Sequence, residues 1–145
     1  IKMNNNKSRN GFTLIELIIV MVILGIMAAV AVPRYLDSIS NAEEAAEDAV
    51  ISAIRSGLTQ YANNSLYESG RAEWPTNPFD ALAEKPVGYS TDNSDADVDG
   101  EWTFSGGRIT HQRADNSRYE WSYDPGTQGG GDDAAIGSLG QRTAL

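Results

Sequence analysis

The chain has 145 residues, with 11 lysines and arginines against 20 aspartates and glutamates, so its formal charge is −9. This acidic balance excludes an extended phosphate-binding surface, because nucleic-acid binders need a basic face, and no nucleic-acid partner is expected. The absence of cysteine excludes a disulfide framework, a cysteine-ligated zinc site and a thiol nucleophile.

The first predicted element is a hydrophobic helix over residues 12–34. Its first 21 residues carry a single charge, Glu16. A helix of 21 residues spans roughly 31 Å, about the thickness of the hydrocarbon core of a bilayer. Three basic residues and no acid precede it, so the positive-inside rule predicts a cytoplasmic N-terminus and an exported remainder. A secretory signal peptide cleaved near Ala31 is the alternative, although the apolar run is long for one.

A motif joins the basic segment to this helix. Lys7-Ser8-Arg9-Asn10-Gly11 is followed by Phe12-Thr13-Leu14-Ile15-Glu16. The pattern resembles the prepilin signature of type IV pilins and type II secretion pseudopilins, and it covers about a quarter of the chain. The resemblance implies a leader over residues 1–11, cleavage between Gly11 and Phe12 by a prepilin peptidase, and N-methylation of Phe12. A start at Met3 would give a leader from Met3 to Gly11.

Glu16 attracts a functional hypothesis from its position alone. An acid inside a membrane helix is energetically costly and is therefore a candidate functional residue. Cleavage after Gly11 would create a cationic amine at Phe12, and in a helical stack this amine could neutralise Glu16 of a neighbouring subunit. Because a wrong register would leave a buried charge unpaired, Glu16 is expected to set assembly register. A boundary glutamate that extends to the headgroups is the alternative.

Gly25 and Pro33 are predicted to weaken the hydrophobic helix. Proline lacks the amide proton that the helix needs and clashes with the preceding turn, and glycine costs roughly 1 kcal/mol relative to alanine. The stretch between them could open when the subunit leaves the bilayer. Close helix packing at the glycine and a benign kink at the proline explain the two residues equally well.

An amphipathic helix is expected to continue over residues 35–63, so that one long helix would run from Phe12 to Asn63. Its apolar residues recur every three or four positions, which predicts one stripe that packs on the rest of the chain. The stripe consists of Ala42, Ala45, Ala46, Ala49, Val50, Ala53, Ile54, Leu58 and Tyr61.

Residues 64–124 are predicted to form a connecting loop and an antiparallel sheet of three or four strands. Proline and glycine dominate the loop, which includes a short helical turn over residues 79–84. The sheet should present one aromatic face to the amphipathic helix, giving an α+β, pilin-like fold. Residues 125–145 are expected to form an irregular, Gly-rich tail. Strands are expected over 87–90, 101–105, 108–113 and 118–124, with a hairpin turn at Gly106-Gly107.

An acidic loop has the opening spacing of a calcium-binding loop. Asp95, Asp97 and Asp99 alternate before a glycine, and Glu101 adds a further oxygen ligand. The closing acid of an EF-hand is missing, so calcium would need a looser site, and a solvated acidic loop is the alternative. The resemblance favours calcium, because major pseudopilins bind it in their strand–loop region. No cofactor is otherwise required. His111 is expected to be a buried structural histidine.

The preferred function is a structural subunit of a type IV pilus, not an enzyme. Its expected partners are further copies of the chain in a helical filament, the prepilin peptidase, the pilus assembly machinery, and the inner membrane before assembly. The precursor would cross the inner membrane once and end in an extracellular pilus or, as a pseudopilin, in a periplasmic pseudopilus. The alternatives are a major pseudopilin of a type II secretion system and, from another class, a membrane-anchored binding module.

Overall fold

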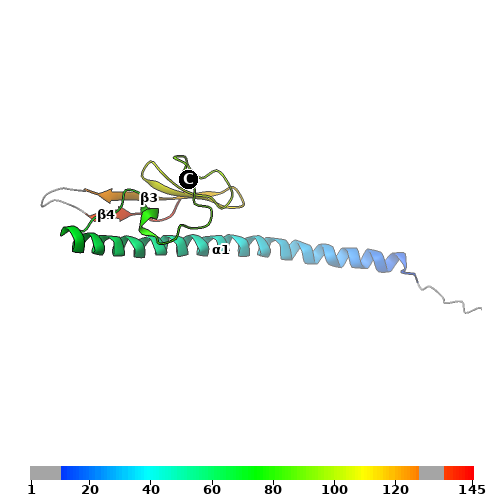
Figure 1. The fold of residues 1–145 in the computed structure, drawn as a ribbon. Helices are drawn as coiled ribbons and strands as arrows, with labels where there is room; N and C mark the ends of the chain where they lie inside the picture. Colours follow the sequence, from blue (N-terminus) through cyan, green and yellow to red (C-terminus); the bar gives the residue numbers. More distant parts are fainter. Residues whose placement is uncertain (1–10, 128–135) are drawn as a thin grey trace, which may run out of the picture. The chain divides into compact units, whose positions relative to one another are not determined.

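The computed structural model describes residues 11–127 and 136–145. These described residues divide into two compact units, one that ends at Ala42 and one that begins at Glu43. One helix, α1 (Leu14–Ser69), contributes to both units. In the second unit it packs with an antiparallel sheet, which confirms the α+β class (Figure 1). The predicted leader up to Asn10 and the glycines at 129–131 lie outside the described residues.

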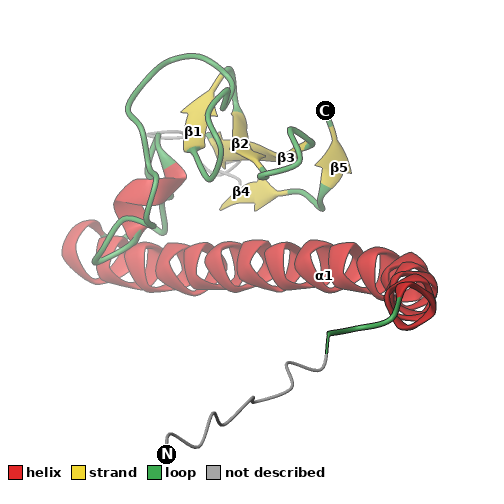
Figure 2. Cartoon of the chain, turned by 90° about the vertical axis from the view of Figure 1, so that its right-hand side faces the viewer, coloured by secondary structure: helices red, strands yellow, loops and turns green. Residues whose placement is uncertain are grey.

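The sheet has five strands within the described residues. They are β1 (Trp102–Ser105), β2 (Arg108–Gln112), β3 (Arg118–Gly126), β4 (Ile136–Leu139) and β5 (Thr143–Ala144). The order is β1-β2-β3-β4, β5 also pairs with β3, and every pairing is antiparallel. Figure 2 shows the sheet above α1, with β4 on the side nearer the helix. The sequence predicted β1, β2, β3 and the hairpin between β1 and β2 correctly.

The register of β1, β2 and β3 builds the core of the second unit from aromatic rows. Trp102 lies opposite His111, and Ile109 lies opposite Trp121. The rings of Trp102 and Trp121 stack with their centroids 5.6 Å apart, which accounts for much of the interior. Phe79 packs edge-on against Trp102 at 6.5 Å and is completely buried. The predicted aromatic face is therefore the core face of the sheet.

The face of α1 that meets this core agrees only in part with the predicted stripe. Its buried residues are Glu47, Ile51, Ile54, Gly57, Leu58 and Ala62. Of the predicted stripe, Ile54 and Leu58 are buried and Val50 is half-buried, but the alanines at 42, 45, 46, 49 and 53 are exposed, so the prediction was wrong for the alanines. Both stripes have helical spacing, and the one that carries branched side chains fills the interior because it buries more apolar area.

Two predicted boundaries change for local reasons. The helix ends at Ser69 instead of Asn63, where Gly70 takes a φ of 77° and its amide bonds the carbonyl of Leu66. The strand expected at Val87–Ser90 was wrong: Tyr89 makes only an isolated parallel bridge to Trp102. Its ring instead packs on Phe79 of the short 3₁₀ helix η1 (Pro78–Ala81), at a centroid distance of 4.5 Å.

The C-terminal tail, expected to be irregular, contributes two short strands. β4 extends the sheet from β3 through the pairs Tyr123–Leu139 and Asp124–Ser138, and β5 pairs with the start of β3. The expectation was wrong because pairing with β3 and the side-chain contacts described below, not a local apolar pattern, hold this segment.

A close approach between α1 and η1 generates a first prediction. A Cβ atom at Gly57 would lie 2.5 Å from the carbonyl oxygen of Ala81. Gly57→Ala should therefore destabilise this second unit, which begins at Glu43 and is called the head. The expected loss is roughly 1–3 kcal/mol, although alanine normally favours a helix by about 1 kcal/mol. Thermal unfolding of the detergent-solubilised chain, followed by near-ultraviolet circular dichroism, measures this effect. The exposed neighbour change Ser56→Ala is the control and should shift stability by about 0.5 kcal/mol or less. Equal stability of Gly57→Ala and the parent would contradict the close approach.

Candidate functional site

The N-terminal end of α1 is closed by a reciprocal capping box. The Thr13 amide and hydroxyl both donate to Oε2 of Glu16 at 2.8 Å, and the Glu16 amide donates to Oγ1 of Thr13 at 3.3 Å. These bonds satisfy amide groups that would otherwise have no partner at the helix start. Glu16 was predicted to pair with the amine of a neighbouring subunit. In the single chain its carboxylate already accepts hydrogen bonds from Thr13.

The capping box also explains where the helix begins. The sequence predicted a helical start at Phe12, but α1 begins at Leu14 because Thr13 is its N-cap. Gly11 and Phe12 precede the cap outside the helix, and the Phe12 side chain is 93% exposed. The bond expected to be cleaved therefore lies in non-helical backbone, which a peptidase can accommodate in extended form. The Thr-x-x-Glu spacing of Thr13 and Glu16 is the sequence signal for this cap.

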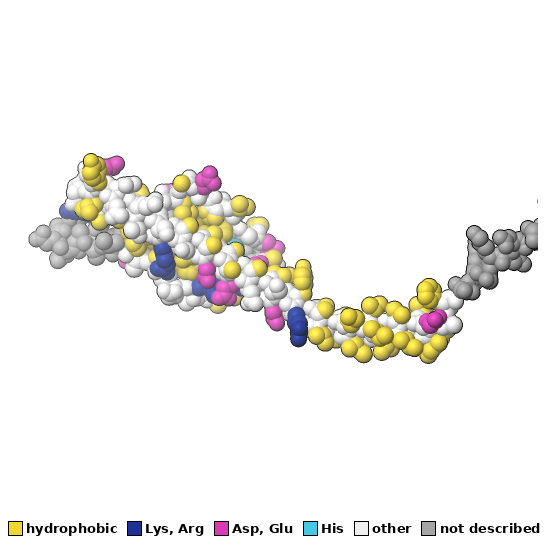
Figure 3. Space-filling model, turned by 90° about the horizontal axis from the view of Figure 1, so that it is seen from below, with side chains coloured by type: hydrophobic (Ala, Val, Ile, Leu, Met, Phe, Trp, Pro, Cys, Tyr) yellow, Lys and Arg dark blue, Asp and Glu magenta, His cyan; other side chains and the backbone are white. Residues whose placement is uncertain are grey.

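The first half of α1 has an exposed apolar surface on all sides. None of its apolar side chains is buried within the chain: Leu14, Ile15, Leu17, Ile18, Ile19, Val20, Met21, Val22, Ile23, Leu24, Ile26, Met27, Val30 and Val32. Figure 3 shows hydrophobic side chains over this part of the helix. Among the described residues α1 is the one helix long and apolar enough to cross a membrane. Water would solvate this surface poorly, so lipid or other protein must cover it.

Gly25 and Pro33 both lie inside α1, and the helix assignment continues through them without a gap. A Cβ at Gly25 would meet nothing within 4 Å in the single chain, so Gly25 serves no close contact there. The predicted opening between the two residues concerns the packed state and stays a prediction.

A cluster of charged side chains lies in the head, around a completely buried carboxylate. Glu47 of α1 accepts hydrogen bonds from Nε and Nη2 of Arg113, both at 2.7 Å. His111 Nδ1 lies 2.9 Å from one carboxylate oxygen, and Nη1 of Arg142 lies 3.2 Å from the other. The guanidinium of Arg113 stacks on the Tyr119 ring at 4.1 Å. The cluster joins α1, the end of β2 and the C-terminal segment.

The electrostatics of Glu47 follow from this geometry. Burial alone would raise its pKa, but the hydrogen bonds from Arg113 and His111 outweigh burial and hold the pKa at about 2. The same carboxylate raises the pKa of Arg113. His111 is buried and structural, as the sequence predicted. Glu47 itself was missed, because it stands among exposed acids; its signal is that it falls in step with Ile51, Ile54 and Leu58.

The acidic loop is organised by protein contacts. The Asp95 carboxylate accepts hydrogen bonds from Nε and Nη2 of Arg108, at 3.1 and 2.8 Å. Oε2 of Glu101 accepts hydrogen bonds from the backbone amides of Asp97 and Val98. The bond from Asp97 is the main cause of the lowered pKa of Glu101. Asp99 lies 3.4 Å from the Gln112 amide. Within residues 11–127 and 136–145, no group of three acidic or histidine side chains is positioned to hold a metal ion. Calcium binding there stays a prediction.

Comparison with known proteins matches the N-terminal segment and much of the head. Residues 6–32 match the family model described as the prokaryotic N-terminal methylation motif. The chain is 41% identical over 100 residues to the type IV narrow pilus major component PilA5 of Thermus thermophilus, spanning 69% of this chain and 74% of that protein. No solved structure matches the chain.

Two further relatives are matched over about half of their length. The type IV major pilin protein PilE1 of Neisseria gonorrhoeae is 37% identical over 81 residues, which are 56% of this chain and 46% of that protein. The type II secretion system core protein G of Pseudomonas aeruginosa is 36% identical over 83 residues, 57% of this chain and 55% of that protein.

The Glu47 cluster generates a prediction of pH dependence. The folded pKa of about 2 lies below the ordinary value of 4.5, so the unfolded chain takes up the proton first as the pH falls. The stabilisation is fully present above about pH 4.5 and is lost as the pH falls to about 2. The difference between the folded and the ordinary pKa corresponds to roughly 3 kcal/mol of stabilisation.

The matched variant is Glu47→Gln, with the exposed Glu68→Gln as control. At pH 7 Glu47→Gln should destabilise the head by roughly 3–5 kcal/mol, because it leaves Arg113 without its counter-charge. The gap between variant and parent should shrink between pH 4.5 and 2.5, while Glu68→Gln tracks the parent. A difference in stability that stays constant with pH would contradict the proposed role of Glu47. If the variant does not fold, a carbon-13 titration of the Glu47 carboxyl in the parent chain still measures the folded pKa.

Proposed function

We propose, from the premise that the chain belongs to the type IV pilin and pseudopilin family, that it is the repeating structural subunit of a type IV pilus. The observation that carries the proposal is the exposed apolar half of α1, which begins at Leu14, two residues after Phe12. The identity with the Thermus thermophilus pilus component over 100 residues supports the same conclusion. The relatives named as pilins are structural proteins, and no catalytic role is proposed.

The apolar half of α1 suits two successive environments. As a precursor, the chain would cross the inner membrane once, because this segment matches the bilayer core in length and composition. In a filament, the same surface would pack against the helices of neighbouring copies. Both environments remove the apolar side chains from water, at roughly 25 cal/mol per Å² of buried area, so transfer between them costs little. The expected partners are therefore other copies, the prepilin peptidase and the assembly machinery.

Glu16 is proposed to change partners when the leader is removed. In the intact chain its carboxylate is held by Thr13. Cleavage after Gly11 turns the Phe12 amide into a cationic amine, which is a stronger partner for a carboxylate than neutral donors are. In the low dielectric of a helix bundle, a subunit at the wrong height would leave both charges unpaired. The pair between Phe12 of one copy and Glu16 of the next would then fix the axial register.

Opening of α1 between Gly25 and Pro33 is proposed to accompany assembly. Pro33 leaves one helix carbonyl without its usual amide, and Gly25 lowers helix stability. Extension of this stretch would let the head and the N-terminal half adjust to neighbours independently.

A pseudopilin of a type II secretion system is the second candidate, favoured by the relative from Pseudomonas aeruginosa. The pilin match covers more of the chain, and the acidic loop uses its carboxylates for protein contacts, so a pilus is preferred. A subunit of surface pili is abundant in the fraction sheared from cells, whereas a pseudopilin stays in the periplasm. Quantitative mass spectrometry of that fraction separates the two functions.

Processing is a direct prediction. The mature protein should begin at Phe12 and carry one additional methyl group on its α-amine. The intact mass of the assembled protein, with sequencing of its N-terminal peptide, measures both changes. A mature chain that begins after Ala31 would show instead that the hydrophobic segment is a signal peptide.

The register role of Glu16 can be separated from its capping role by three variants. Glu16→Val removes charge and cap and should abolish filaments while leaving the monomer in the membrane. Glu16→Gln keeps an acceptor for Thr13 but no charge, and should also fail to assemble. Thr13→Val weakens the cap by about 1 kcal/mol and keeps the charge, so it should assemble. Counting filaments by electron microscopy against membrane-inserted monomer gives the result. Assembly of Glu16→Gln together with failure of Thr13→Val would assign Glu16 to capping alone.

A further inference from the structure

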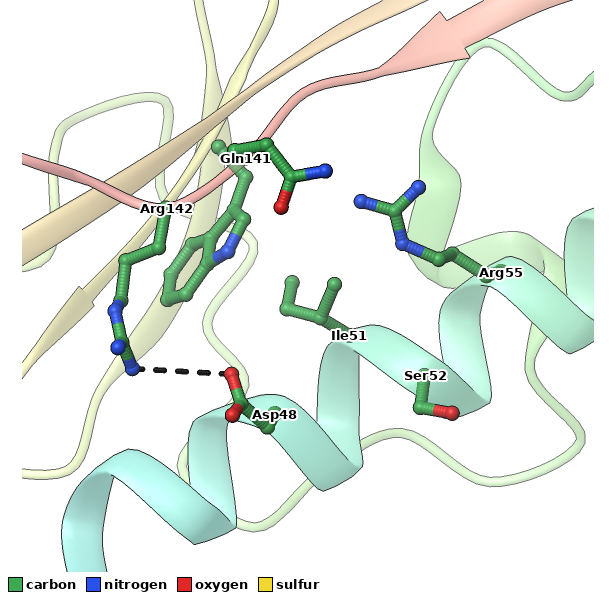
Figure 4. Close-up of a pocket in the computed structure, with 7 residues that line it drawn as sticks. Asp48, Ile51, Ser52, Arg55, Gln141 and Arg142 are labelled. Atoms are coloured by element: carbon green, nitrogen blue, oxygen red, sulfur yellow. Dashed lines mark ion pairs between the residues drawn. The ribbon is translucent and has the colours of Figure 1, made fainter. Parts of the chain in front are cut away.

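A pocket of about 430 Å³ lies on the head between α1, β3 and the C-terminal segment. Asp48, Ile51, Ser52 and Arg55 of α1 form one wall, and Gln141 and Arg142 form the other (Figure 4). In this view Gln141 and Arg55 point toward each other across the space above Ile51. The volume falls within the range of small-molecule sites, and polar groups converge on an apolar floor.

Trp121 of β3 lines this pocket and has an unused polar group. The residue is 98% buried, with 2% of its surface exposed. Among the described residues, its indole Nε1 donates to no acceptor. Every side-chain nitrogen or oxygen in these residues that is fully sealed from solvent has a hydrogen-bond partner, so the Trp121 nitrogen is not fully sealed. The indole nitrogen therefore keeps some exposure to solvent, and the pocket that Trp121 lines is an opening through which this N–H can meet a ligand. An indole can only donate, so the group that completes this pocket is an acceptor.

Arg55 supplies an uncommitted positive charge at the same place. Its Nη2 donates to the carbonyl of Gly140 at 2.9 Å, which fixes the guanidinium over the pocket. In the part of the chain that the structure describes, Arg55 forms no ion pair with an acid. A guanidinium has five N–H donors in a planar fork, so several remain for a ligand. The Gln141 amide adds a neutral donor at the rim.

The second arginine of the pocket is already neutralised. Arg142 pairs with Glu44, lies 3.2 Å from Glu47, and lies 3.7 Å from Asp48. Arg142 is therefore held in place at the side of the pocket, and its positive charge is already balanced by these acids. Asp48 is two-thirds exposed and places a negative charge at the rim. A ligand with one negative charge would balance Arg55, whereas a phosphate dianion would bring a second charge close to Asp48 and Glu44.

From these contacts we propose that the pocket is a binding site for a carboxylate group. A carboxylate is planar, carries one charge and matches the guanidinium fork, with an oxygen left for the indole N–H. The carboxylate comes from a free small acid, such as a sugar acid, or from an acidic side chain of a neighbouring copy. The site does not depend on filament assembly, because all its residues belong to one head.

The test uses the full chain in detergent micelles, labelled with nitrogen-15 at its three tryptophans. Sodium glucuronate is the probe, and methyl glucoside and sodium chloride are the controls. Glucuronate should shift one indole signal downfield and saturably, and that signal should be the one missing in Trp121→Phe. If Trp121→Phe does not fold, calorimetric titration of the parent and of the variants below replaces the assignment.

Three variants test the assignment of roles. Arg55→Gln should weaken glucuronate binding about tenfold or more, from the loss of charge-assisted hydrogen bonds. Arg71→Gln, outside the pocket, should leave it unchanged. Asp48→Asn should strengthen binding, because it removes a like charge from the rim. Equal shifts with methyl glucoside, binding that survives Arg55→Gln, or tighter binding of inorganic phosphate would each overturn the proposal.

Filaments distinguish the two sources of the carboxylate. If a neighbouring copy supplies it, the Trp121 signal in assembled filaments should already lie at its bound position, and glucuronate should not move it. If the ligand is a free acid, glucuronate should shift the signal in filaments as it does in micelles. A failure to form filaments would bear on the proposed function only, because the micelle titration tests the pocket by itself.

Discussion

The buried carboxylate of Glu47 is the interaction on which the head depends. It joins α1 to the end of β2, through His111 and Arg113, and to Arg142 near the C-terminus, three segments that are far apart in the sequence. The chain has no cysteine, so no covalent link could do this. Desolvation of the charge is costly, and three charge-assisted contacts offset it only when all partners are in place. Such a cluster therefore specifies one arrangement of helix, sheet and tail more than it adds raw stability.

The position of the pocket follows from the same cluster. Arg142 is held by Glu47 and Glu44, and the backbone of Gly140 next to it is held by Arg55. These two anchors place Gln141 over the floor formed by Ile51. On the opposite face of the sheet, the acidic loop acts as a cover: the Ala96 amide donates to Thr110 at 2.8 Å, and Ala96 is completely buried. The ion pair of Arg108 with Asp95 and the backbone amides that donate to Glu101 help to hold that cover in place.

The sequence predicted the elements that have strong local signals. Alternating aromatics and the Gly106-Gly107 turn located β1, β2 and β3, because strand period and hairpin geometry are local properties. β4 and β5 have no such pattern. Pairing with β3 and the contacts of Arg55 and Arg142 hold these two strands in place, and such long-range contacts cannot be predicted from the local sequence. The exposed alanine stripe was misassigned because two stripes on α1 share the same period. Only the volume required by the aromatic core selects between them.

Two acids on α1 show what a periodic reading can and cannot detect. Glu16 stood out because it interrupts a long apolar run, so its cost was visible in the sequence. Glu47 was hidden among Glu43, Glu44 and Asp48, yet it alone of these four is fully buried. It precedes Ile51, Ile54 and Leu58 at steps of four, three and four residues, so it occupies the apolar face. An acid in step with the buried face, on a helix whose other acids are not, requires cationic partners from the opposing sheet. His111 in β2 and Arg113 directly after β2 are partners of this kind. Comparing the positions of acids on the helix with those of basic residues on the sheet therefore gives information that neither element gives alone.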